Sequence, residues 1–227
     1  NNELLGVDNE DNTLTFVDEK YKSYQVTIEQ NSPVITYIVY GVDIKIYVTK
    51  EGFKIKSTGG KLAVTEYPPH IKYFDGRERF VSSRGYIWSR SIPMLKDTLF
   101  LGYGPDNYCI YFPQDDFVGK ANGLKLRTIV DKPHNMFMQI GINTGVISLI
   151  ALIILFLIYF IDSMKLYFKY EFITLEDYLG AGIVTAIIGY LAAGMFNDHI
   201  VSVSPIFWAL LGLGISINLR LKNKLNY

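Results

Sequence analysis

The stretch with the clearest chemical potential is DKPHNMFMQIGINTG, residues 131–145, where a charged run meets a long apolar one. His134 and Asn135 stand at the boundary. A neutral imidazole can take a proton from a substrate hydroxyl, as a general base must. Asn135 is a residue type that caps helix N-termini, and the positive end of such a helix favours a neutral imidazole. Taken alone, these residues are compatible with either a catalytic role or a purely structural role for His134.

Further upstream, three arginines, Arg79, Arg84 and Arg90, cluster within a span of twelve residues, and Trp88 follows Arg84 by one helical turn. The planar guanidinium fork matches phosphate oxygens, so the group predicts diphosphate binding. A solvated or lipid-headgroup face is the alternative. Trp88 could stack on a sugar, or it could lie in the interfacial aromatic belt.

The sequence gives little support to other kinds of site. A metal site formed by His134, Asp198 and His199 is conceivable, but three ligands with this spacing are not diagnostic, and we predict no metal. We expect no cofactor. A Gly-rich phosphate loop at LGYGPDNY, residues 101–108, is a poor alternative, because neither a GxGxxG nor a GxxxxGK[ST] motif is present. The net charge of zero gives no indication of nucleic-acid binding, and the single cysteine, Cys109, excludes an intrachain disulfide.

The candidate site residues must be held in place by the rest of the chain, which contains three segments without charged residues. About 20 apolar residues are needed to span a bilayer as a helix, so we predict transmembrane helices over about 136–161, 178–197 and 203–219. Small residues in the second segment would let neighbouring helices approach closely; the glycines among them are Gly180, Gly182, Gly189 and Gly194.

Lysine and arginine in short loops predict the orientation of these helices. The 162–177 loop and the C-terminal tail carry basic residues, whereas the loop NDHIVSVS, residues 197–204, has none. We therefore expect a cytoplasmic C-terminus, and His134 with everything before it outside the cytoplasmic membrane.

The part before the membrane helices divides in two. Residues 12–67 alternate with a period of two, with turn signals at 50–52 and at Gly59-Gly60, and predict an antiparallel β-meander. Residues 82–98 predict a helix capped by Ser82 or Ser83 and broken at Pro93, and 113–133 a polar loop. We expect a β region over 1–80, a helix-and-loop region over 81–135 and the membrane region over 136–227: an α+β membrane protein. The β region alone favours a spacer or binding platform.

Taken in order, these motifs resemble the O-antigen ligase-like superfamily, which includes lipopolysaccharide O-antigen ligases, Wzy-type polysaccharide polymerases and bacterial O-oligosaccharyltransferases. His134, Asn135 and Gly145 fit its His-[Asn/Ser/Gln]-x9-Gly-x-x-[Gly/Thr/Tyr] signature. The last position of the signature is Ser148 here, which departs from the pattern. The upstream Arg84, Trp88 and Gly102-Tyr103-Gly104-Pro105 also fit, and the resemblance covers about residues 80–218.

The resemblance implies a multi-pass GT-C-type fold of which this chain is a C-terminal fragment, with further transmembrane helices upstream and the β region in an extracytoplasmic loop. It implies metal-independent transfer of glycan from a polyprenyl-diphosphate carrier to a hydroxyl of a glycan, lipid or protein, outside the bacterial cytoplasmic membrane. By carry-over, Arg84 would stabilise the diphosphate, His134 would activate the acceptor and Asn135 would orient the site. Arg79, Arg90 and Trp88 are further substrate-binding candidates. A non-enzymatic, membrane-anchored β module that binds glycan or a partner protein is the alternative function.

Overall fold

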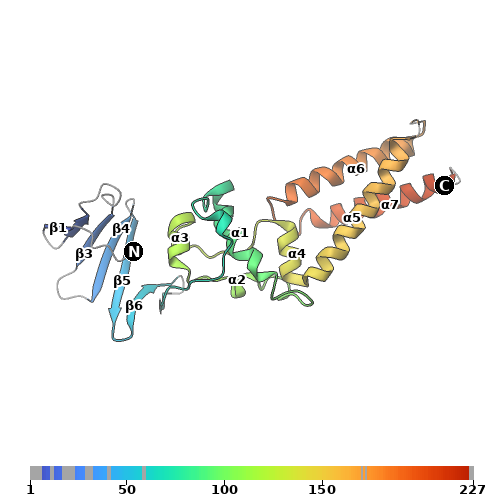
Figure 1. Cartoon of the computed structure of the whole chain (residues 1–227). Helices are drawn as coiled ribbons and strands as arrows, with labels where there is room; N and C mark the ends of the chain where they lie inside the picture. Colours follow the sequence, from blue (N-terminus) through green and yellow to red (C-terminus); the bar gives the residue numbers. More distant parts are fainter. Residues whose placement is uncertain are drawn as a thin grey trace. The chain divides into compact units, whose positions relative to one another are not determined.

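A computed structural model describes residues 7–10, 13–16, 24–28, 33–39, 42–57, 60–169, 171 and 173–224 (Figure 1). The chain forms two compact units. The first comprises Asn1–Pro68 with Pro113–Ile129, and the second comprises Pro69–Phe112 with Val130–Tyr227.

The first unit contains an antiparallel sheet whose seven strands pair in chain order, which confirms the expected antiparallel sheet. Alternating side chains produce it: Ile35 pairs with Ile46 and Tyr37 with Ile44 across adjacent strands. Gly52, at φ 112°, closes one hairpin, while Gly59 lies outside the described residues. The strands are β1 (Val7–Glu10), β2 (Thr13–Phe16), β3 (Tyr24–Ile28), β4 (Val34–Val39), β5 (Val42–Thr49), β6 (Gly52–Lys56) and β7 (Leu62–Ala63).

The second segment of this unit is not only the polar loop that the sequence predicts, because it contains helix α3 (Phe117–Gly123). Asp116 caps the helix by accepting a hydrogen bond from the Gly119 amide at 2.8 Å. Lys120 is fully buried, and its Nζ donates to the carbonyls of Gln114 at 2.6 Å and Thr128 at 2.8 Å. Burial lowers the pKa of this ammonium. The lysine therefore ties the two ends of the segment together.

The second unit begins with a short 3₁₀ turn, η1 (Lys72–Phe74), and helix α1 (Phe80–Met94). The expected serine cap is wrong: Ser82 and Ser83 lie inside the helix start, and with Val81 they have left-handed backbone angles, φ 44° to 69°. Three consecutive non-glycine residues in this region are costly. The helix ends one residue after Pro93, near the expected break. A hydrogen bond of 2.6 Å between the Ser91 and Tyr108 hydroxyls joins α1 to α2 (Tyr108–Tyr111).

Four helices follow: α4 (Met136–Thr144), α5 (Val146–Tyr167), α6 (Leu175–Gly194) and α7 (Ser204–Lys224). Within the described part of the chain, α5, α6 and α7 are the three helices long and apolar enough to cross a membrane. They share an apolar core that includes Phe156, Ile187 and Phe207. The sequence predicts one helix over 136–161, but the structure breaks it at Gly145, at φ 106° and ψ 151°. In Figure 1, the direction of α4 makes a steep angle with the directions of α5, α6 and α7.

Glycines permit some close approaches between these helices and not others. A Cβ at Gly180 would collide with the Tyr167 hydroxyl, and one at Gly194 would press on Met136 at 3.2 Å. Nothing lies within 4 Å of the corresponding position at Gly182 or Gly189. The small-residue expectation therefore holds at Gly180 and Gly194, where helices pack through glycine.

The loop before α2 forms backbone hydrogen bonds to both sides of the break between α4 and α5. The Tyr103 and Gly104 amides donate to the Ile142 and Asn143 carbonyls at 2.9 and 3.0 Å, and the Val146 and Ile147 amides donate to the Thr98 and Leu99 carbonyls at 2.9 and 3.2 Å. These four bonds, which we call the helix brace, satisfy groups that every helix end leaves unpaired. Gly102 lies against the Asn143 backbone, and a Cβ there would collide with it.

Substitution of Gly102 tests the brace. Gly102→Ala places a methyl group against backbone that cannot move aside, so we expect the unfolding free energy to fall by about 2 kcal/mol or more. The thermal midpoint in detergent micelles measures the loss. The control is Gly212→Ala in α7, where nothing lies within 4 Å of the added Cβ and alanine favours the helix. Equal midpoints for the two variants would contradict the role of the brace.

Candidate functional site

Three segments meet around His134: helix α1, the residues leading into α4, and the loop from α6 to α7. The Trp88 indole Nε1 on α1 donates to the Pro133 carbonyl at 2.9 Å, and its ring lies 5.9 Å from the Phe196 ring. Trp88 therefore touches both other segments. Its contacts make it a positioning residue for the His134 segment.

His134 pairs with a carboxylate that lies 64 residues away in the chain. Its Nδ1 lies 2.9 Å from Oδ2 of Asp198, whose side chain is 11% exposed. An ionised carboxylate only accepts hydrogen bonds, so Nδ1 carries the proton and Nε2 is left as an acceptor. His134 also has φ 49°, an uncommon backbone conformation for a non-glycine residue. Such strained positions cluster at functional sites.

Asn135 uses both ends of its amide. Oδ1 accepts from the Met138 amide at 2.9 Å, which is the N-cap that the sequence predicts. Nδ2 donates to the Met195 carbonyl at 2.7 Å, at the C-terminal end of α6. One side chain thus begins α4 and ties it to the loop that carries Asp198.

Arg84 is held by its own helix start. Its Nη1 donates to the Val81 carbonyl at 3.1 Å, within the left-handed turn. Its Nε is buried and lacks a hydrogen-bond partner among the described residues. A buried N–H donor without a partner is costly and calls for an explanation. Within the described residues no hydrogen bond or ion pair joins Arg84 directly to His134.

The other two arginines of the predicted group have different surroundings. Arg90 is buried, donates to the Ser89 hydroxyl at 3.0 Å and lies over the Tyr86 ring at 4.8 Å from its centroid. Arg79 is exposed at the N-cap of α1. Arg90 is therefore packed in the interior as a cation–π partner of Tyr86. Arg84 differs from it in having a buried Nε donor without a hydrogen-bond partner among the described residues.

His199, the neighbour of Asp198, points to a different set of partners. Trp208 Nε1, which can only donate, lies 3.2 Å from Nε2, and the Ser204 hydroxyl also contacts that nitrogen. Nδ1 therefore carries the proton and donates to the Tyr190 hydroxyl at 2.9 Å. Across the residues that the structure describes, no group of three His, Cys, Asp or Glu side chains could hold a metal ion. The conceivable triad of His134, Asp198 and His199 is thus split between two networks.

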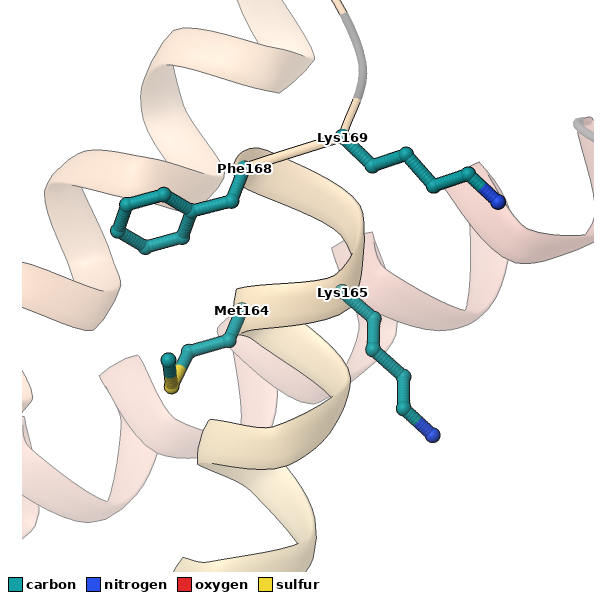
Figure 2. A pocket seen from close by; sticks show the side chains of 4 residues that line it. All are labelled: Met164, Lys165, Phe168 and Lys169. Atoms are coloured by element: carbon teal, nitrogen blue, oxygen red, sulfur yellow. The ribbon is translucent and has the colours of Figure 1, made fainter.

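A shallow pocket of about 420 Å³ lies at the other end of α5, away from His134. In Figure 2 the Met164 and Phe168 side chains, which line it, point to one side of the helix end, and those of Lys165 and Lys169 point to the other. Long basic side chains at a helix end, next to apolar ones, are typical of the boundary between hydrocarbon and lipid headgroups. The pocket has the composition of such a boundary and is no part of the site around His134.

A family model described as O-antigen ligase (Wzy_C) matches residues 32–153, more than half of the chain. The chain belongs to the O-antigen ligase family. Neither the curated proteins nor the solved structures contain a match to it. Membership implies a glycosyltransferase-like ligase activity, a glycan or lipid-linked substrate and membrane embedding, in agreement with the three apolar helices.

The match to the O-antigen ligase family starts earlier and ends earlier than the motifs in the sequence indicate. It takes in β4, β5 and β6 and stops within α5, whereas the motif resemblance runs from about residue 80 to 218. His134, Asn135 and Arg84 lie inside the matched range, and Asp198 lies beyond it. Sequence reasoning considered Asp198 only as a metal ligand, because chain separation hides its pairing with His134.

The hydrogen bond to Asp198 predicts the tautomer of His134. In the ¹⁵N-histidine spectrum of the chain at about pH 8, above the usual histidine pKa of about 6.5, we expect His134 to carry its proton on Nδ1. Asp198→Ala should shift it towards the Nε2–H form. Only three histidines are present, so His134→Gln assigns the signal. An Nε2–H tautomer in the unsubstituted chain would contradict the pairing.

The burial of His199 predicts a pH dependence. Burial lowers its pKa from the ordinary 6.5, so the folded chain binds this proton less readily than the unfolded chain. The group costs no stability above about pH 6.5, and stability falls as the pH drops below that value towards the folded pKa. We expect the thermal midpoint to fall more between about pH 7.5 and pH 5.5 in the unsubstituted chain than in His199→Gln. Equal losses would assign the dependence to other groups.

Proposed function

We propose that the chain carries the acceptor-activating part of a membrane glycosyltransferase, which transfers or polymerises glycan from a polyprenyl-diphosphate carrier onto an acceptor hydroxyl. The observation that carries the proposal is the 2.9 Å hydrogen bond between His134 and Asp198. It sits at the start of α4, within a chain of the O-antigen ligase family. The acceptor hydroxyl belongs to a glycan, a lipid or a protein.

His134 acts as the general base of this proposal. As the acceptor oxygen forms its bond to the anomeric carbon of the donor sugar, its proton passes to Nε2, which the tautomer leaves free to accept. Asp198 stabilises the imidazolium that results and fixes the ring orientation, as the acidic member of a catalytic triad does. The bond from the anomeric carbon to the diphosphate oxygen breaks at the same time, and the electron pair leaves with the diphosphate.

Arg84 stabilises the leaving group. A diphosphate gains negative charge as the bond to the sugar breaks, and a guanidinium held in place beforehand stabilises that charge without reorganising. The unpartnered Nε of Arg84 supports this role because it is a donor awaiting an acceptor. Arg79 and Arg90 remain secondary candidates for binding the donor, and Asn135 and Trp88 position the segment that carries His134.

Basic residues support an extracytoplasmic site on the bacterial cytoplasmic membrane. Lys165 lies in the last turn of α5 and Lys169 just after it, and the α7 end carries Arg220, Lys222 and Lys224. Since α6 reverses the direction between them, all five lie at one end of the helices, and basic loops stay in the cytoplasm. His134 belongs to the opposite end. A lipid-linked donor, whose diphosphate stays at the membrane surface, would meet it there.

Paired substitutions in the full-length protein test the proposal. We expect His134→Ala to lower glycan transfer from a lipid-linked donor by about 10²- to 10⁴-fold, and Arg84→Ala by about 10²- to 10³-fold. The matched controls are His70→Ala, whose imidazole pairs with Asp75 at the surface, and Arg77→Ala, whose guanidinium lies over Tyr73. Both controls should transfer normally.

Protein level in the membrane is measured for each variant, so that loss of folding is separated from loss of chemistry. Normal transfer by His134→Ala would remove it from the mechanism and favour a non-enzymatic β module that binds glycan or a partner. Equal losses in Arg84→Ala and Arg77→Ala would show that arginine content, not the place of Arg84, matters.

A further inference from the structure

We propose that the loop Leu99–Phe100–Leu101 inserts into the bilayer and anchors the helix-and-loop region to the lipid leaflet at the Val146 end of α5. The partner is the acyl-chain region of phospholipids. This inference rests on the membrane-spanning character of α5 and not on glycan transfer.

The side chains of the loop are large, apolar and exposed. Leu99, Phe100 and Leu101 are 50%, 76% and 83% exposed. Three consecutive large apolar side chains with this exposure are unusual for a water-facing loop, and exposed apolar patches mark interaction surfaces. On either side the chain carries exposed charged residues, Lys96 and Asp97 before the loop and Asp106 after it.

The loop has a fixed place relative to the membrane. The Val146 and Ile147 amides, at the first turn of α5, donate to the Thr98 and Leu99 carbonyls. The loop backbone is therefore attached to the residue at which the membrane helix begins. In Figure 1 the green loop lies beside the start of α5.

Exposed apolar side chains on the first turns of α5 adjoin the loop. Ile147 and Ile150, on the first turns of α5, are each 51% exposed, as expected of side chains that face lipid. Leu99 is bonded to Ile147 through the backbone, so the loop continues the same lipid-facing surface. This continuity favours lipid over a second protein as the occupant.

Aromatic side chains lie beside the loop, as at other membrane–water boundaries. Tyr103 and Tyr111 stack with centroids 3.8 Å apart, and Tyr111 is 52% exposed. Tyrosine is enriched at the headgroup level, where one end of the ring is apolar and the other wet. The neighbouring Ile110 is 73% exposed. These residues would lie at the headgroup level when the tip, Phe100 and Leu101, is inserted.

Spin labelling of the full chain tests the insertion. In a Cys109→Ser background, single variants Phe100→Cys, Leu101→Cys and Asp97→Cys are labelled with a nitroxide and reconstituted into vesicles of phosphatidylethanolamine and phosphatidylglycerol. We expect the ratio of oxygen to nickel-chelate collision rates to exceed one at 100 and 101 and to fall below one at 97. Ile150→Cys on α5 supplies the lipid-facing standard.

Two results would overturn the proposal. A ratio below one at 100 and 101, with the Ile150 standard above one, would place the loop in water. Low collision rates with both reagents at 100 and 101 would show that protein covers the loop, either a second copy or another helix. Glycan transfer can be lost or kept in either case, so failure here is distinct from failure of the proposed enzyme.

Discussion

The arrangement of the second unit depends on satisfying the backbone where one helix stops and the next begins. Between α4 and α5 the chain turns through Gly145, leaving carbonyls at one helix end and amides at the other without helical partners. Backbone groups left unpaired within the hydrocarbon core of a bilayer cost several kcal/mol each. The helix brace meets this demand from a loop about forty residues earlier in the chain. It needs glycine at 102, for close approach, and at 145, for the positive φ.

The break determines where the site can lie. A continuous helix from residue 136 would run straight into the membrane and carry its first residues along one axis. The turn at Gly145 instead frees α4 to follow its own direction, so that Met136 packs against Gly194 and Asn135 reaches the Met195 carbonyl. The start of α4 is thereby brought to the α6–α7 loop, and His134 comes within hydrogen-bond distance of Asp198. Helix termination and site assembly are two results of the same local geometry.

Much of this was predictable from local sequence, and the exceptions share a cause. Strand alternation predicts the antiparallel sheet, apolar length predicts the membrane helices, and Asn135 is a cap by residue type. The split at Gly145 was missed because the residues around it are apolar, and hydropathy does not register a backbone turn. The serine cap on α1 was wrong because the left-handed turn at 81–83 displaces the helix start. The pairing of Asp198 with His134 was hidden because tertiary packing, not spacing, creates it.

The loop between α6 and α7 has a consequence for how the family can vary. Asp198 and His199 are adjacent, yet one pairs with His134 and the other packs among Tyr190, Ser204 and Trp208. These two sets of partners depend on the length of a short connection fixed at both ends by helices. Inserting or deleting one residue would shift both side chains along the loop and disturb the pairing of Asp198 with His134. We therefore expect relatives that share this pairing to keep the length of the loop as well as the carboxylate.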